Sequence, residues 1–268
     1  MTASIDLNCD MGESFGAHRI GDDAAMMPLI TSANVACGFH GGDPPVIGAT
    51  LALAKAAGVA VGAHPSFMDL YGFGRRRIMG ERPEDLKAQL VYQIGAVKVM
   101  ADSLGWPITH VKTHGALGNM AAEDPALAAV CVGALRAVDP TLALVAMPYS
   151  ALMRAAEAAG VTVVCEVYAD RRYADNGMLM PRGLAGAVIH DPEESLRQVL
   201  SMVLDGHVPT VGGKRLPVSA DTLCIHGDTQ GAVDIARRLR DKLDAAGIAV
   251  RPFRLPFHPS PEDRPCSA

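Results

Sequence analysis

Histidine, carboxylate and lysine side chains recur in this sequence beside turns that contain glycine. His40 stands in the segment GFHGGD, His64 in GAHPS, His114 in KTHGA and His226 in IHGD. Three of these four histidines are followed directly by glycine, which lets the chain turn sharply and leaves the imidazole open. General acid–base catalysis and metal binding require such side chains. Their repeated occurrence predicts one shared functional site.

Each of these residues also has a structural interpretation. A single histidine could be a hydrogen-bonded loop residue. Lys112 could form an ion pair with Glu166 or Asp10, although a lysine in a barrel mouth more often contacts substrate or phosphate. Arg75, in the stretch GFGRRR, is by default solvated, but a bidentate pair with a substrate carboxylate is the functional alternative. We favour the functional interpretation because similar residues recur in several segments.

A metal site is a separate hypothesis. Asp10, His40 and His64 would supply a mixed nitrogen and oxygen ligand set with open positions, which suits Zn²⁺ or another transition ion. Mg²⁺ is the alternative ion. The three residues come from different segments, so their spacing alone does not support the set.

The elements that must position these residues follow a simple alternation. Short apolar runs typical of parallel strands cover residues 5–9, 33–37, 59–63, 108–112, 142–147, 161–168 and 222–226. Helical patterns cover residues 44–57, 83–104, 125–138, 150–159, 192–204 and 231–246. This repetition predicts parallel strands joined by right-handed crossovers, in a barrel or in an open doubly wound sheet.

The position of the polar residues favours the barrel. Side chains alternate between the two faces of a strand, so Asp6, Asn8 and Asp10 share one face. The same pattern aligns His110 with Lys112 and His114, Glu166 with Tyr168 and Asp170, and His226 with Asp228. A sheet covered by helices on both faces would not tolerate this charge, whereas a barrel that opens into an active site would. We predict a single α/β barrel domain over residues 1–256 and a proline-rich, poorly ordered tail over residues 257–268.

Composition excludes several classes of function. The formal net charge is −5 without a basic stripe, which argues against nucleic acid as a partner. The segment MTASIDLNCD lacks the features of a signal peptide, and no apolar run approaches the ~18 residues of a membrane span. The six cysteines lack C-x-x-C spacing, and we interpret them as buried thiols of a cytoplasmic protein. GGK at residues 212–214 lacks the rest of a phosphate-binding loop.

Six segments, taken together and in order, resemble the LamB/YcsF family. They are DLNCDMGESFG (6–16), NVACGFHGGDP (34–44), GAHPSF with GFGRR (62–76), HVKTHGALGN (110–119), EVYADRRYADNGMLMPR (166–182) and CIHGDTQGAV (224–233). The resemblance implies a seven-stranded, TIM-like (β/α) barrel related to the glycoside hydrolase/deacetylase superfamily. The chain departs from the family pattern at Gly118, where an aromatic residue is usual, which would enlarge the pocket.

The family is associated with a prokaryotic ATP-dependent 5-oxoprolinase. The resemblance therefore implies hydrolysis of the lactam of 5-oxo-L-proline to L-glutamate, with ATP converted to ADP and phosphate, in a complex with two other subunits (B and C). ATP would be bound by or with those partners. The catalytic candidates are Asp10, Lys112, His114, Glu166, Asp170 and His226, and the substrate-binding candidates are Asn8, Glu13, Asn34, Asp43, Arg75 and Arg171. Asp10 and His114 would do the acid–base work and Lys112 would neutralise developing charge.

Two other functions stay open at this point. One is a metal-dependent amide hydrolase or deacetylase that needs no ATP, which a tightly bound stoichiometric ion would favour. The other is a non-catalytic subunit that binds a small carboxylate and presents it to its partners. Such a protein would be stabilised by its ligand without turning it over.

Overall fold

Seven parallel strands close into a barrel in the computed structural model, which describes residues 3–253 except 182, 190, 226 and 228–230. The strands follow one another in the order β1 (Ser4–Met11), β2 (Ser32–Ala36), β3 (Ala60–His64), β4 (His110–Lys112), β5 (Ala143–Ala146), β6 (Val163–Tyr168) and β9 (Thr222–Ile225). Pairing of Asp6 with Thr222 and of Leu7 with Leu223 joins β9 to β1 and closes the ring. The predicted seven-stranded (β/α) barrel is confirmed.

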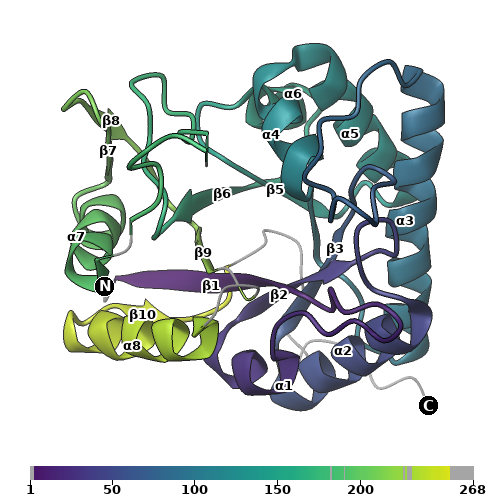
Figure 1. The fold of residues 1–268 in the computed structure, drawn as a ribbon, viewed down its shortest axis with the longest axis horizontal. Helices are drawn as coiled ribbons and strands as arrows, with labels where there is room; N and C mark the ends of the chain where they lie inside the picture. The colour runs from purple at the N-terminus through teal and green to yellow at the C-terminus, as the bar shows by residue number, and fades with distance from the viewer. Residues whose placement is uncertain (1–2, 182, 190, 226, 228–230, 254–268) are drawn as a thin grey trace.

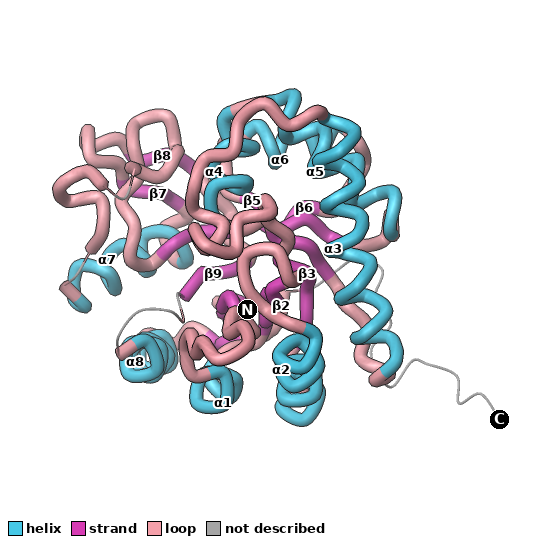
Figure 2. The backbone as a smooth tube through the Cα atoms, turned by 45° about the vertical axis from the view of Figure 1, so that its right-hand side comes forward, coloured by secondary structure: helices cyan, strands magenta, loops and turns pink. Residues whose placement is uncertain are grey.

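The helices lie outside this ring of strands (Figures 1 and 2). They are α1 (Asp23–Met26), α2 (Pro44–Ala57), α3 (Pro83–Ser103), α4 (Gly115–Glu123), α5 (Pro125–Val138), α6 (Ala151–Ala158), α7 (Pro192–Val203) and α8 (Ala232–Ala245). Proline in the first turn suits four of them, and the side chains of Asp43, Asp124 and Asp191 accept hydrogen bonds from the first free N–H groups of α2, α5 and α7. None of the helices in the described part of the chain has the length and apolar character to cross a membrane.

The main elements agree with the predicted ranges to within one or two residues, but several short ones were not predicted. These are α1, the 3₁₀ helix η1 (Met27–Leu29), α4, the antiparallel hairpin of β7 (His207–Pro209) and β8 (Arg215–Pro217), and β10 (Ala249–Val250) beside β1. Helix α4 escaped prediction because it begins directly after His114, whose side chain makes no capping hydrogen bond. The predicted tail over residues 257–268 lies outside the described residues.

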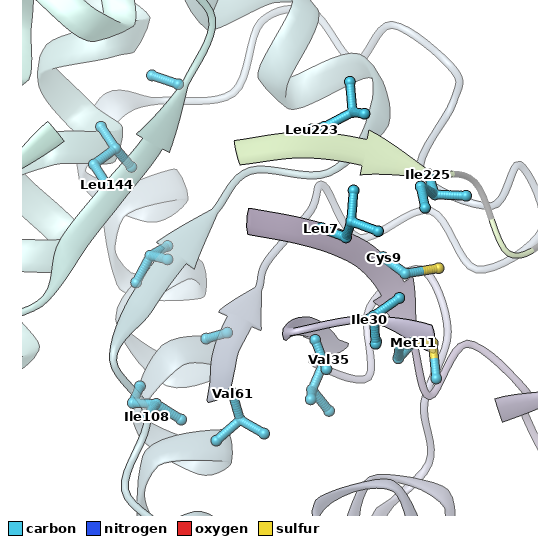
Figure 3. Close-up of a cluster of buried hydrophobic side chains, with 14 of the residues drawn as sticks. Leu7, Cys9, Met11, Ile30, Val35, Val61, Ile108, Leu144, Leu223 and Ile225 are labelled. Atoms are coloured by element: carbon cyan, nitrogen blue, oxygen red, sulfur yellow. The ribbon is translucent and has the colours of Figure 1, made fainter. Parts of the chain in front are cut away.

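Apolar side chains cover the outer face of the barrel and pack against the helices. Figure 3 shows this cluster, with Leu7 and Cys9 on β1, Val35 on β2 and Leu223 on β9 among its members. All four are fully buried or nearly so. Their burial is the main favourable contribution to folding, at roughly 25 cal/mol per Å² of apolar surface removed from water. The five described cysteines are buried and none forms a disulfide.

The opposite face of the same strands fills the barrel with polar side chains. The Asn8 amide donates to Thr222 Oγ1 over 2.8 Å, and Asn8 Oδ1 accepts from the Asn34 amide over 2.8 Å. Asn34 Oδ1 faces His110 Nε2 at 3.0 Å. Since His110 Nδ1 lies 2.8 Å from the hydroxyl of Thr109, both ring nitrogens have partners. Buried polar groups are tolerated here because the network satisfies them.

At the amino-terminal end of the strands, apolar residues close the barrel around a buried carboxyl group. Phe253 packs against Ala143, Val145 and Val164, and its ring meets that of His110 edge-on at 5.3 Å. Asp6 lies at the same end of the barrel and accepts hydrogen bonds from several hydroxyl groups, including that of Ser32 over 2.8 Å. Burial nevertheless raises the pKa of Asp6 from 3.8 to about 6.

Gly62 on β3 leaves the space that the His110 ring occupies, since a Cβ at this position would overlap the ring. We expect Gly62→Ala to lower the free energy of unfolding by about 1–3 kcal/mol through overpacking. Gly95 in α3 is the matched control, because nothing lies within 4 Å of a Cβ there. Gly95→Ala should be stabilising by about 0.5–1 kcal/mol in the same denaturant titration. Equal effects of the two substitutions would contradict the packing described.

Asp6 also makes stability depend on pH. Its pKa is higher in the folded chain, so its contribution is complete below the unfolded value of 3.8 and is lost as the pH rises through about 6. Relative to Asp6→Asn, the wild type should lose about 1.4 kcal/mol of unfolding free energy between about pH 5 and about pH 8. Denaturant titrations at the two pH values measure this difference. A difference that does not change with pH would show that the pKa of the carboxyl group is not raised.

Candidate active site

A cavity of about 460 Å³ opens where strands β4, β5 and β6 end. The ionisable residues in its lining include Asp10, His64, Arg75, Arg77, Lys112, His114, Glu166 and Arg171. Asp10 lies at the end of β1, His64 and Lys112 are the last residues of β3 and β4, and His114 precedes α4. The carboxyl ends of barrel strands are the usual place for an active site, and this chain concentrates its buried charge there.

Lys112 holds two carboxylates together at the base of the cavity. Its Nζ lies 2.7 Å from Glu166 Oε1 and 3.0 Å from Asp10 Oδ1, and it also donates to Asn8 Oδ1 over 3.2 Å. Burial by itself would lower the pKa of Lys112, but the neighbouring anionic groups, Asp10 foremost, hold it well above its usual value. The ammonium group therefore stays charged and neutralises negative charge inside the barrel.

Asp10 stays ionised for the same reason. Burial works to raise its pKa, but the neighbouring His64 and Lys112 outweigh burial and hold the pKa well below its usual value. Asp10 Oδ2 lies 3.3 Å from His64 Nε2, and its side chain keeps 15% exposure to the cavity. On the other side of Lys112, Tyr168 donates from its hydroxyl to Glu166 Oε2 over 2.5 Å.

Three histidine rings form a compact group beside Asp10. His64 Nδ1 lies 2.7 Å from the backbone oxygen of Lys112, and His114 Nε2 lies 2.8 Å from that of Phe73. The other two ring nitrogens, His64 Nε2 and His114 Nδ1, face each other at 3.0 Å. His40 stacks on His114 with ring centroids 3.7 Å apart, and its Nε2 lies 3.2 Å from Glu13 Oε1. Burial lowers the pKa of His114 to about 3, so this ring is neutral at neutral pH.

The loop after β3 positions the His114 ring. Phe73 and Gly74 both have left-handed backbone conformations, with φ of 54° and 64°. A Cβ on Gly74 would lie 2.7 Å from His114 Cδ2 and 2.9 Å from His40 Cβ. Glycine at this position therefore lets the loop reach the histidines, and the strained conformation of Phe73 aims its carbonyl at His114.

Arginines line the same cavity. The Arg75 guanidinium lies 5.0 Å from the centroid of the Phe73 ring, and Arg171 donates from Nη2 to the Met180 carbonyl over 2.6 Å. Gly118 also lines the cavity, next to Thr113, whose carbonyl oxygen would lie 2.7 Å from a Cβ at position 118. Guanidinium groups in this position suit a carboxylate or phosphate ligand.

Some of the residues predicted to form the site line the cavity and others do not. The cavity lining includes Asp10, His64, Arg75, Lys112, His114, Glu166 and Arg171. The lining does not include Asn8, Asn34, Glu13, His40, Asp43 or Asp170. Asn8 and Asn34 are buried inside the barrel, where they support Lys112 and Asp10, while Glu13 and His40 lie behind the cavity histidines. His226 lies outside the described residues.

Two predicted site residues lie away from this cavity. Asp43 was predicted to bind substrate, but its carboxylate accepts hydrogen bonds from the backbone N–H groups of Gly16 and Val46 and caps α2. Asp170 was predicted to be catalytic, but it follows β6 outside the cavity lining. Both follow strands closely in the sequence, which is the signal that suggested them. Sequence reasoning also missed Phe73, because its contribution comes from a backbone carbonyl.

A group of residues that could hold a metal ion overlaps with the predicted set. Within the part of the chain that the structure describes, ligand atoms of Glu13, His40, His64 and His114 all lie within 4.8 Å of one another. His40 and His64 were predicted as ligands. Glu13 and His114 join them in place of Asp10. Sequence spacing does not reveal which side chains face each other.

The family model of the LamB/YcsF family matches residues 5–257. The chain belongs to the LamB/YcsF family. A relative from Rhodopseudomonas palustris, named as the A subunit of 5-oxoprolinase, is 53% identical over 249 residues, which cover 93% of this chain and 98% of the relative. A relative from Heliobacterium modesticaldum with the same name is 51% identical over 247 residues, covering 92% of this chain and 97% of the relative.

Two solved structures resemble this chain, and the first agrees with the family membership. The lactam utilization protein from Thermus thermophilus is 47% identical and superimposes with a TM-score of 0.88, covering 93% of this chain and 100% of that one. A putative cellobiose-phosphate cleavage protein from Enterococcus faecalis has 13% identity and a TM-score of 0.55, covering 94% and 98% of the two chains. At that identity, the second likeness supports the barrel fold alone.

Lys112 should be required for the stability of the fold. We expect Lys112→Met to lower the free energy of unfolding by about 3–5 kcal/mol, since it leaves Asp10 and Glu166 buried without their cation. Lys98→Met is the control: Lys98 pairs at 3.0 Å with Asp102, a carboxylate 44% exposed, and its loss should cost less than about 1 kcal/mol. Denaturant unfolding at neutral pH compares the two. Equal stabilities of Lys112→Met and wild type would contradict the ion-pair network.

Proposed function

We propose that this chain is the A subunit of an ATP-dependent 5-oxoprolinase, which hydrolyses the lactam of 5-oxo-L-proline to L-glutamate as ATP is converted to ADP and phosphate. The observation that carries the proposal is the pairing of Lys112 with Asp10 and Glu166 at the base of a cavity lined by arginines. Relatives that match nearly the whole chain and are named as the A subunit of 5-oxoprolinase support the choice of reaction.

The ligand chemistry of the cavity suits this substrate. 5-Oxoproline is a small anion with one carboxylate and one cyclic amide. A guanidinium group binds a carboxylate through two parallel hydrogen bonds, and we assign this contact to Arg75 or Arg171. With the carboxylate held at the arginines, the lactam lies toward Asp10 and Lys112.

Hydrolysis of the lactam needs a base for water and a cation for the oxygen. Phosphorylation of the amide oxygen by ATP makes the ring carbon electrophilic, so that a weak base is enough. Asp10 takes a proton from the attacking water and returns it to the ring nitrogen as the C–N bond breaks, which leaves the opened chain as an acyl phosphate. A second water cleaves this acyl phosphate and releases glutamate and inorganic phosphate. Lys112 neutralises the charge that builds up on the oxygen. We give the proton transfer to Asp10 rather than His114, because the Asp10 side chain is 15% exposed, whereas that of His114 is 5% exposed and both of its nitrogens are directed at other protein groups.

Binding of the nucleotide is best assigned to the partner subunits. Residues 212–214, the GGK segment, lie between β7 and β8, and Lys214 pairs with Asp175 at 3.5 Å. This segment therefore does not form a phosphate-binding loop. We propose that ATP is bound by or together with subunits B and C, and that the complex works in the cytoplasm, where its free cysteines stay reduced.

The test is to co-express the chain with the products of neighbouring genes and to assay glutamate and phosphate release from 5-oxoproline and ATP. We expect Asp10→Asn to lower kcat by at least about 100-fold, because an amide does not accept the proton. Asp85→Asn, which removes a carboxylate 51% exposed on the first turn of α3, should leave kcat unchanged. An assembled wild-type complex without 5-oxoproline-dependent phosphate release would refute the proposal, and so would full activity of Asp10→Asn.

A further inference from the structure

His64 Nε2 and His114 Nδ1 face each other, and the contacts of the other nitrogen in each ring indicate where the protons lie. His64 Nδ1 and His114 Nε2 each lie within 2.8 Å of a backbone carbonyl oxygen, which only accepts hydrogen bonds. A neutral ring therefore carries its single proton on that side. In that state His64 Nε2 and His114 Nδ1 are left with lone pairs, and these atoms lie 3.0 Å apart. Two lone pairs at this distance need a cation or a proton between them.

The atoms around this pair are also electron-pair donors. Glu13 Oε1 lies 3.6 Å from His114 Nδ1 and 3.2 Å from His40 Nε2, and Asp10 Oδ2 lies 3.3 Å from His64 Nε2. All of the side chains except that of Asp10 are 5% exposed or less. His40 Nδ1 is buried without a hydrogen-bond partner among the described residues, while its Nε2 faces Glu13. Glu13, His40, His64 and His114 converge on a single point from three loops and a strand end.

We propose that these four side chains bind one divalent transition-metal ion of the Zn²⁺ class. The ligand set supports a cation, because it consists of three imidazoles and one carboxylate. Imidazole nitrogen favours Zn²⁺ and its neighbours in the transition series over Mg²⁺, which prefers oxygen. The carbonyls of Lys112 and Phe73 supply the outer contacts that fix the rings of metal-binding histidines.

The site adjoins the cavity through Asp10, which lies beside His64 and lines the cavity. A bound ion would act as a Lewis acid there. This role in the reaction rests on the proposed function, whereas metal binding itself does not. In this arrangement His114 is a ligand, which agrees with leaving the proton transfer to Asp10.

Metal binding is tested on the purified full-length chain. The protein is stripped with a chelator and titrated with Zn²⁺ and with Co²⁺, whose visible spectrum reports the ligand geometry. We expect one ion per chain and a rise in Tm on binding. His64→Gln and His114→Gln should each weaken binding by more than about 100-fold, because the loss of a ligand exceeds the loss of an outer contact. His18→Gln is the control, since His18 is exposed and lies outside the group.

A second variant distinguishes the loss of a ligand from misfolding of the chain. Glu13→Gln keeps the size of the side chain and removes only the anionic ligand, so it should weaken Co²⁺ binding with a Tm of the stripped protein close to that of wild type. The alternative is a proton on His64 Nε2. An imidazolium signal from His64 in ¹⁵N NMR at neutral pH, together with no uptake of Zn²⁺ or Co²⁺, would overturn the proposal. So would unchanged binding in both glutamine variants of the histidines.

The outcome is separable from that of the proposed function. Full 5-oxoprolinase activity in a complex stripped of metal, with no ion taken up by the chain, would remove the metal site and leave the reaction in place. A tightly bound ion in a complex that does not act on 5-oxoproline would do the reverse.

Discussion

The interior of this barrel depends on keeping buried charge in balance. Taking a carboxylate or an ammonium group out of water costs several kcal/mol, and only close partners of opposite charge and well-directed hydrogen bonds offset that cost. Lys112 meets this requirement for Asp10 and Glu166 together, within 3.0 Å of each. Asn8 Oδ1 accepts a further hydrogen bond from the same ammonium group. Removal of one member would leave the others buried without compensation, so the network acts as a unit.

The polar network below the cavity links this balance to the fold. Asn34 donates to Asn8 and Asp10 and faces His110, so side chains from β1, β2 and β4 are tied to one another. Most strands present apolar groups to the helices and polar groups to the interior, whereas β5 consists of apolar residues alone. The barrel therefore has two cores of opposite character, an apolar one outside the strands (Figure 3) and a hydrogen-bonded one within them.

Much of this arrangement could be predicted from alternation along the strands. The shared face of Asp6, Asn8 and Asp10 identified the barrel interior, and the strand ends identified His64, Lys112 and Glu166 as neighbours of one cavity. Asp43 showed the limit of that reasoning. A carboxylate after a strand is equally suited to cap the next helix, and its type and position do not distinguish the two roles.

The sequence by itself determined the repeating strands and helices, the polar face of each strand and the set of side chains able to do chemistry, because these depend on local periodicity and residue type. Only the tertiary structure decided which of them meet. The facing nitrogens of His64 and His114 are set by two backbone carbonyls, one of them on a left-handed residue of a distant loop. Backbone carbonyls are the same in every residue, so their direction depends on the path of the folded chain and leaves no trace in residue type.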